Sequence, residues 1–113
     1  MTTPKESVYR QLLVVRCQRG DREAMEELIA AWEKRLFYYI HRMVDQEADA
    51  WDVMQETWVK VFRKVKSLKD PQSFPGWLYA LTRNTVFSHL RRRPAMRRAF
   101  DTLDTRQLTV LRE

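Results

Sequence analysis

The chain of 113 residues is long enough for one domain with a hydrophobic core and too short for two domains of ordinary size. Apolar residues make up 44% of the sequence, which excludes a disordered chain, and the single cysteine excludes an internal disulfide and a multi-cysteine zinc site. The two histidines have no ligand-like neighbours, so we expect no metal or other cofactor. No apolar run approaches the length of a membrane span, and the first residues lack the apolar segment of a signal peptide. We therefore expect a cytoplasmic protein.

Helical periodicity dominates the sequence, and two glycines and four prolines leave few positions for turns. Four helices are expected, over residues 6–19, 22–44, 47–66 and 74–93. In the first helix, one apolar stripe is expected to face the core; it consists of Val8, Leu12, Val15 and, widening it, Leu13. Gly20 is suited to the left-handed conformation that ends a helix, and Asp21 is suited to the N-cap of the next helix.

The later helices also carry apolar stripes. The stripe of the third helix consists of Trp51, Met54, Trp58, Val61, Phe62 and Val65. We expect Trp32, Trp51 and Trp58 to lie in the core. Pro71 disfavours helix at the residue before it, so a loop precedes the fourth helix. Because four stripes need one another for burial, the predicted fold class is all-α, a compact bundle of about four helices. Residues 95–113 are expected to be a linker or the start of a further helix.

The net charge of +6 is concentrated in one segment. Residues 76–100 hold six arginines and no acid, whereas the rest of the chain holds equal numbers of acidic and basic side chains. Positive charge gathered in this way is typical of a surface that binds nucleic acid. The alternative interpretation is a solvated basic helix end, because arginine also suits the C-terminus of a helix.

Acidic residues gather at the start of the third helix. Asp49, Asp52 and Glu56 have the spacing that places side chains on one helical face, and Gln55 adjoins them. Carboxylates and a carboxamide on a rigid helix can accept hydrogen bonds from the arginines of a partner protein. The alternative is an acidic N-terminus favoured by the helix dipole, which explains Glu56 less well because that residue lies well inside the helix.

The segment ADAWDVMQETWVKVFRKVKSLKDPQSFPGWLYALTRNTVFSHLRRR resembles region two of bacterial sigma factors, closest to the extracytoplasmic-function (ECF) group. The matching elements, in their order, are Asp52, Gln55–Glu56, Trp58, Phe74, Trp77–Leu78–Tyr79, Arg83–Asn84 and His89–Leu90–Arg91–Arg92. The chain departs from the pattern at Ser88, where the family often has an acid, and at Pro75–Gly76, where it often has a bulkier or charged pair. The resemblance implies a region two domain over residues 1–94, with no region four helix-turn-helix in residues 95–113.

The resemblance also implies two binding surfaces. In the family, the acidic face of the third helix docks on the clamp helices of the largest subunit of core RNA polymerase; the residues carried over are Asp49, Asp52, Gln55 and Glu56. The fourth helix and the loop before it bind the −10 promoter element, and the loop closes over a base flipped from the non-template strand. The DNA-binding residues carried over are Lys69, Asp70, Pro71, Gln72, Ser73, Arg83, Asn84, His89, Arg91, Arg92 and Arg93.

Some residues of the fourth helix are expected to be structural. Phe74, Trp77 and Leu78 begin the helix on the side that should face the bundle, and Tyr79 and Phe87 are placed nearer the core than the DNA. The implied protein is a promoter-specificity subunit and not an enzyme, with an anti-sigma factor as a further partner. The alternative function is a stand-alone helical adaptor that binds polymerase or another protein without opening promoters.

Overall fold

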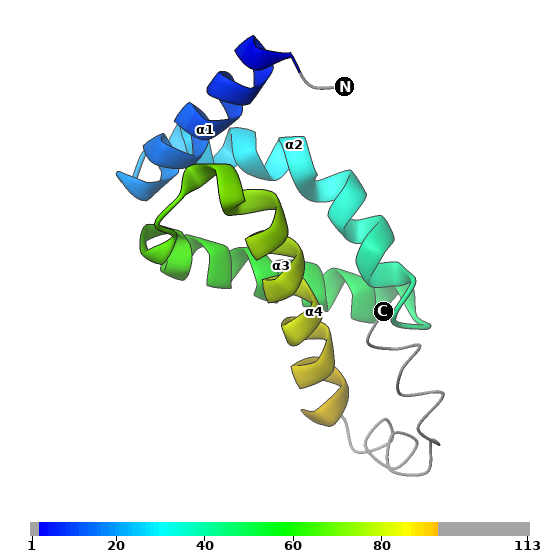
Figure 1. Cartoon of the computed structure of the whole chain (residues 1–113). Coiled ribbons are helices and arrows are strands. Elements are labelled where there is room, and N and C mark those ends of the chain that lie inside the picture. Colours follow the sequence, from blue (N-terminus) through cyan, green and yellow to red (C-terminus); the bar gives the residue numbers. More distant parts are fainter. Residues whose placement is uncertain (1–2, 93–113) are drawn as a thin grey trace.

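The computed structural model describes residues 3–92, and helices make up all the regular structure in this range (Figure 1). The elements in chain order are α1 (Pro4–Gln18), α2 (Arg22–His41), α3 (Glu47–Lys64), the short 3-10 helices η1 (Val65–Ser67) and η2 (Pro71–Ser73), and α4 (Phe74–Arg92). The expected all-α bundle of four helices is confirmed. The expectations for Arg93 and for residues 95–113 lie outside the described residues.

Local chemistry accounts for several helix ends. Thr3 caps α1 by accepting a hydrogen bond from the backbone N–H of Glu6, whose side chain accepts one from the backbone of Thr3 in return. Gly20 has φ of 86°, which only glycine adopts without strain, and it follows α1 as expected. The side chain of Asp21 accepts a hydrogen bond from the backbone N–H of Ala24 and so caps α2, also as expected.

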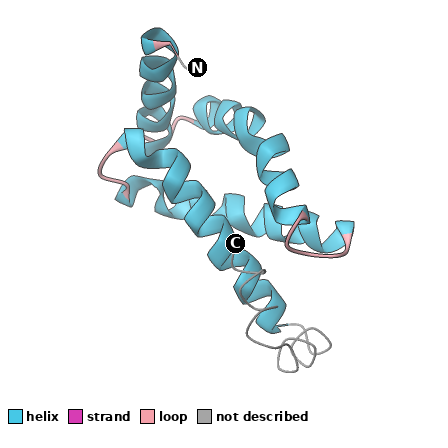
Figure 2. Cartoon of the chain, turned by 45° about the vertical axis from the view of Figure 1, so that its right-hand side comes forward, coloured by secondary structure: helices cyan, strands magenta, loops and turns pink. Residues whose placement is uncertain are grey.

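The helices pack in sequence order, and the last one closes the bundle. α1 packs on α2 and on both 3-10 helices, α2 packs along α3, and α4 contacts α3 and α2. Figure 1 shows α4 crossing in front of α3, and Figure 2 shows that the connections between helices are short loops at the ends of the bundle. The loop between α3 and α4 therefore lies beside α1.

The core is formed by side chains from all four α-helices, most of them aliphatic, together with the aromatic rings of Trp32 and Phe74. Its fully buried residues include Leu28, Leu36, Ile40, Val53, Val61, Phe74, Leu78 and Val86. The burial expected for Phe74, Leu78 and Trp32 is confirmed. Trp32 contacts the edges of Phe74 and Tyr79, with ring centroids 6.0 and 6.1 Å apart respectively.

The structure corrects the expected core face of α1 and two aromatic positions of α3. Val8 and Leu12 are 56% and 55% exposed, whereas Leu13 is buried as expected, together with Val14 and Cys17. Trp51 and Phe62 are 48% and 66% exposed, although their spacing places them on the apolar stripe of α3. Both helices carry more apolar residues than one packing contact can cover, so periodicity alone does not select the buried face.

Candidate functional site

The loop between α3 and α4 is held in place by α1. The side-chain amide of Gln18 donates hydrogen bonds to the backbone carbonyls of Val65 and Leu68, at 2.9 and 2.7 Å. Further along, the carboxylate of Asp70 accepts a hydrogen bond from the backbone N–H of Gln72 at 3.0 Å and so caps η2. The conformation of the loop is thus fixed at its start by hydrogen bonds from the Gln18 side chain of α1, and at its end by the Asp70 cap of η2.

The loop residues expected to contact DNA differ in their exposure. Lys69, Asp70, Gln72 and Ser73 are exposed, and Pro71 is half-buried. Because Asp70 is occupied in capping the turn, its role in this fold is to shape the loop. The Gln72 amide, the Lys69 ammonium and the Ser73 hydroxyl belong to exposed residues of the loop and can form hydrogen bonds with a ligand.

The exposed face of α4 carries arginine and asparagine. Arg83, Asn84 and Arg91 are all exposed, and Asn84 and Arg91 are seven residues apart, which places them on the same face of the helix. A further cation approaches this helix from α3, because the ammonium of Lys60 donates a hydrogen bond to the Thr85 hydroxyl at 3.1 Å. Sequence reasoning missed Lys60; its position one turn after Glu56 on α3 was the available signal.

Asp49 and His89 do not lie on the surfaces expected of them. Asp49 is only 3% exposed and His89 9% exposed, and the two side chains meet in the interior, with Asp49 Oδ1 3.4 Å from His89 Nε2. Asp49 lies in the first turn of α3 and His89 in the last turn of α4, so the pair connects the two helices at one end of the bundle. The expectation that Asp49 faces a protein partner and His89 faces DNA is corrected to an internal contact.

Glu56 and Arg92 connect the same two helices at the surface. The Arg92 guanidinium donates a hydrogen bond to Glu56 Oε2 at 2.8 Å. This contact holds the pKa of the Glu56 carboxyl below its usual value and raises the pKa of Arg92. A residue carried over to the polymerase surface and one carried over to the DNA surface thus bind each other in the free domain.

The remaining polar residues of the α3 surface lie among exposed apolar side chains. Asp52 and Gln55 are exposed, and Trp51, Val59 and Phe62 are exposed beside them on the same helix. Large aromatic side chains mixed with polar groups are typical of protein interfaces. Sequence reasoning assigned Trp51 and Phe62 to the core and so missed them as surface residues. Trp51 is partly supported by Phe37 of α2, with ring centroids 4.4 Å apart.

Among residues 3–92, no three histidine, cysteine, aspartate or glutamate side chains are grouped in a way that could hold a metal ion. In the same part of the chain, no helix combines the length and apolar character required to cross a membrane.

Comparisons with known proteins identify the family. The model of the sigma-70 region 2 family matches residues 28–95. The chain is 35% identical over 80 residues to the RNA polymerase sigma-H factor of Pseudomonas aeruginosa, an alignment that covers 71% of this chain and 42% of that protein. It is 33% identical over 85 residues to the ECF RNA polymerase sigma-E factor of Haemophilus influenzae, covering 75% of this chain and 44% of the relative.

A third relative is the ECF RNA polymerase sigma factor SigE of Mycolicibacterium smegmatis, 36% identical over 81 residues, with 69% of this chain and 31% of that protein covered. The chain thus spans less than half the length of these curated relatives. The resemblance carried by the sequence motifs is confirmed, and the family is a non-enzymatic one, as expected. The chain belongs to the sigma-70 region 2 family.

Proposed function

We propose that the chain binds core RNA polymerase through α3 and the −10 promoter element through α4 and the loop before it, in the bacterial cytoplasm. One observation carries the proposal. Over residues 76–92, the sequence holds three arginines, all of them exposed, and no aspartate or glutamate, and Glu56 of α3 forms an ion pair with one of them, Arg92. The helix that carries these arginines, α4, packs on α3, the helix that presents Asp52 and Gln55.

The polymerase-binding role is supported by the composition of the α3 surface. Asp52 can accept a bidentate hydrogen bond from an arginine, and the Gln55 amide can accept or donate one beside it. Trp51 adds a large apolar area, which a helical partner would cover. These are the groups that would dock on the clamp helices of the largest polymerase subunit.

The promoter-binding role divides between two kinds of contact. Arg83 and Arg91 would neutralise phosphates and provide affinity that depends little on base sequence. Asn84 would form hydrogen bonds with a base edge and so provide selectivity. The loop over residues 69–73 would close over a base flipped from the non-template strand, since a flipped base needs a pocket that compensates for its lost stacking.

The polymerase contact is tested by charge reversal. Asp52→Lys should weaken binding of the chain to core polymerase in the absence of DNA, measured by biolayer interferometry, and leave the helical circular dichroism spectrum unchanged. Glu33→Lys is the matched control, because Glu33 is an exposed acid on α2. Equal polymerase affinity of the two variants would contradict the assignment of α3.

The DNA contact is tested by salt dependence. Arg91→Ala should reduce the slope of log affinity against log salt by about 0.7 on single-stranded promoter DNA, as expected for the loss of one phosphate contact. Asn84→Ala should instead relax the base preference at one position. Arg22→Ala, at an exposed arginine of α2, serves as the control. A chain that binds polymerase but shows no affinity for promoter DNA would instead support the adaptor function.

A further inference from the structure

We infer that the ion pair between Glu56 and Arg92 is an autoinhibitory contact, which polymerase opens when it docks on α3 and DNA opens when it binds α4. The inference rests on the proposed function and adds a link between its two binding surfaces. The sequence motifs place Glu56 on the polymerase surface and Arg92 on the DNA surface, and the structure joins the two side chains to each other. In the chain without partners, each side chain therefore withholds the other from its own partner.

The carboxylate of Glu56 is the group for which two arginines compete. The Arg92 guanidinium donates a hydrogen bond to Glu56 Oε2 at 2.8 Å, and this contact lowers the pKa of Glu56, so the carboxylate is ionised at neutral pH. An arginine of a partner protein binds a carboxylate most strongly in a bidentate pair, which uses both oxygens. A bidentate pair with polymerase therefore requires Arg92 to leave Oε2.

The neighbours of Glu56 on α3 favour this exchange. Asp52 is exposed and lies four residues before Glu56, so a partner cation that docks on Asp52 arrives within one helical turn of the ion pair. There it repels Arg92 and can replace it on the carboxylate. Lys60 lies one turn after Glu56, and its charge also acts on this carboxylate. Glu56 therefore keeps a cation nearby while Arg92 is exchanged, which lowers the free-energy cost of opening the pair.

Arg92 can leave the pair without a movement of α4. Its side chain is 56% exposed, whereas His89 and Leu90, in the same last turn, are buried and hold the helix against the bundle. Once released, Arg92 joins the exposed Arg91 beside it and offers DNA one more cation for a phosphate. Coupling between two binding sites is reciprocal, so DNA that binds Arg92 must strengthen polymerase binding by the same factor.

The first test measures DNA binding by the 113-residue chain without polymerase. A labelled single-stranded oligonucleotide of thymidines is titrated at several salt concentrations. Glu56→Gln should bind it about 2- to 5-fold more tightly than the wild-type chain, as expected when an exposed ion pair no longer competes. Its slope of log affinity against log salt should be steeper by about 0.7, because one more phosphate contact forms. Glu47→Gln, which removes an exposed acid from the first turn of α3, is the matched control and should leave the slope unchanged. Adding Glu56→Gln to an Arg92→Gln chain should leave it unchanged as well.

The second test measures the reverse effect, the affinity of the chain for core polymerase with and without a saturating concentration of the same oligonucleotide. The gain in affinity should be about 2- to 5-fold larger for the wild-type chain than for Arg92→Gln, a comparison that removes any effect of DNA on polymerase alone. Equal salt slopes for the wild-type and Glu56→Gln chains, with both chains binding DNA and polymerase, would overturn the coupling alone. Absence of DNA affinity in both chains would overturn the proposed promoter-binding function as well.

Discussion

The contact between Asp49 and His89 permits a direct test of the structural role assigned to two residues that the sequence places on binding surfaces. Asp49→Ala removes the acceptor that lies 3.4 Å from His89 Nε2, and both side chains are buried. Leaving a buried polar group without its partner costs about 1–3 kcal/mol, and the long distance places this pair in the lower part of that range. We therefore expect the free energy of unfolding to fall by about 1–2 kcal/mol.

The effect is measurable by thermal unfolding followed by circular dichroism. For a domain of this size, each kcal/mol shifts the Tm by about 4–8 °C, so Asp49→Ala should lower the Tm by about 4–16 °C. Glu47→Ala is the matched control, because Glu47 is an exposed acid in the same first turn of α3 and should change stability by less than about 0.5 kcal/mol. A double-mutant cycle with His89→Ala should give a coupling energy of at least about 0.5 kcal/mol.

One combination of results would refute this reasoning. If Asp49→Ala unfolds at the same temperature as the wild-type chain but loses affinity for core polymerase, Asp49 belongs to the binding surface. An additive cycle, with no coupling between Asp49 and His89, would likewise show that the contact contributes nothing to the fold. The expected result is a loss of stability with polymerase affinity retained under conditions where the variant is folded.

Three further predictions follow from burial and charge. Leu13→Ala should destabilise the chain by about 2–5 kcal/mol and Leu12→Ala by less than about 0.5 kcal/mol in urea unfolding, because only Leu13 is buried. Equal effects would contradict the assignment of Leu13 to the buried face of α1 and Leu12 to its exposed face. Because the Arg92 contact lowers the pKa of Glu56, the pair should add stability above pH of about 4.5 and lose it as the pH falls further; a stability difference between wild type and Glu56→Gln that stays unchanged as the pH falls well below 4.5 would count against it. Burial raises the pKa of the Cys17 thiol to about 11, so this thiol should react with a disulfide reagent at pH of about 8 only after unfolding, and fast labelling of the folded chain would show that α1 is misplaced.

The sequence by itself determined the helices, the family and the separation of charge. Helix ends follow from chemistry within one turn, such as the positive φ of Gly20 and the side-chain cap at Asp21, so they can be predicted without the fold. Even so, α1 begins at Pro4, two residues earlier than expected, because Thr3 caps it. The end of α2 at His41 also comes three residues earlier than expected. The motif of α3 and α4 identified the family because the order and spacing of its residues are properties of the chain alone.

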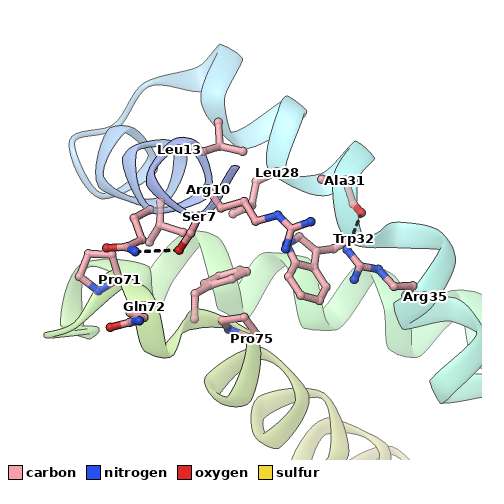
Figure 3. Close-up of a pocket in the computed structure, with 13 residues that line it drawn as sticks. Ser7, Arg10, Leu13, Leu28, Ala31, Trp32, Arg35, Pro71, Gln72 and Pro75 are labelled. Carbon is pink, nitrogen blue, oxygen red and sulfur yellow. Dashed lines mark hydrogen bonds between the residues drawn. The ribbon is translucent and has the colours of Figure 1, made fainter. Parts of the chain in front are cut away.

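Only the tertiary structure decided which side chains are buried and which residues meet. Leu12 and Leu13 are adjacent in sequence, yet one is exposed and the other buried, because α2 packs on one side of α1. Glu56 and Arg92 are 36 positions apart in the sequence, and Asp49 and His89 are 40 positions apart. Both contacts depend on how α4 crosses α3. The cavity between α1, α2, η2 and the start of α4 (Figure 3) likewise depends on packing, since its walls come from these four separate elements. Local propensity acts over a few residues, whereas burial and long-range pairing are set by the relative positions of whole helices.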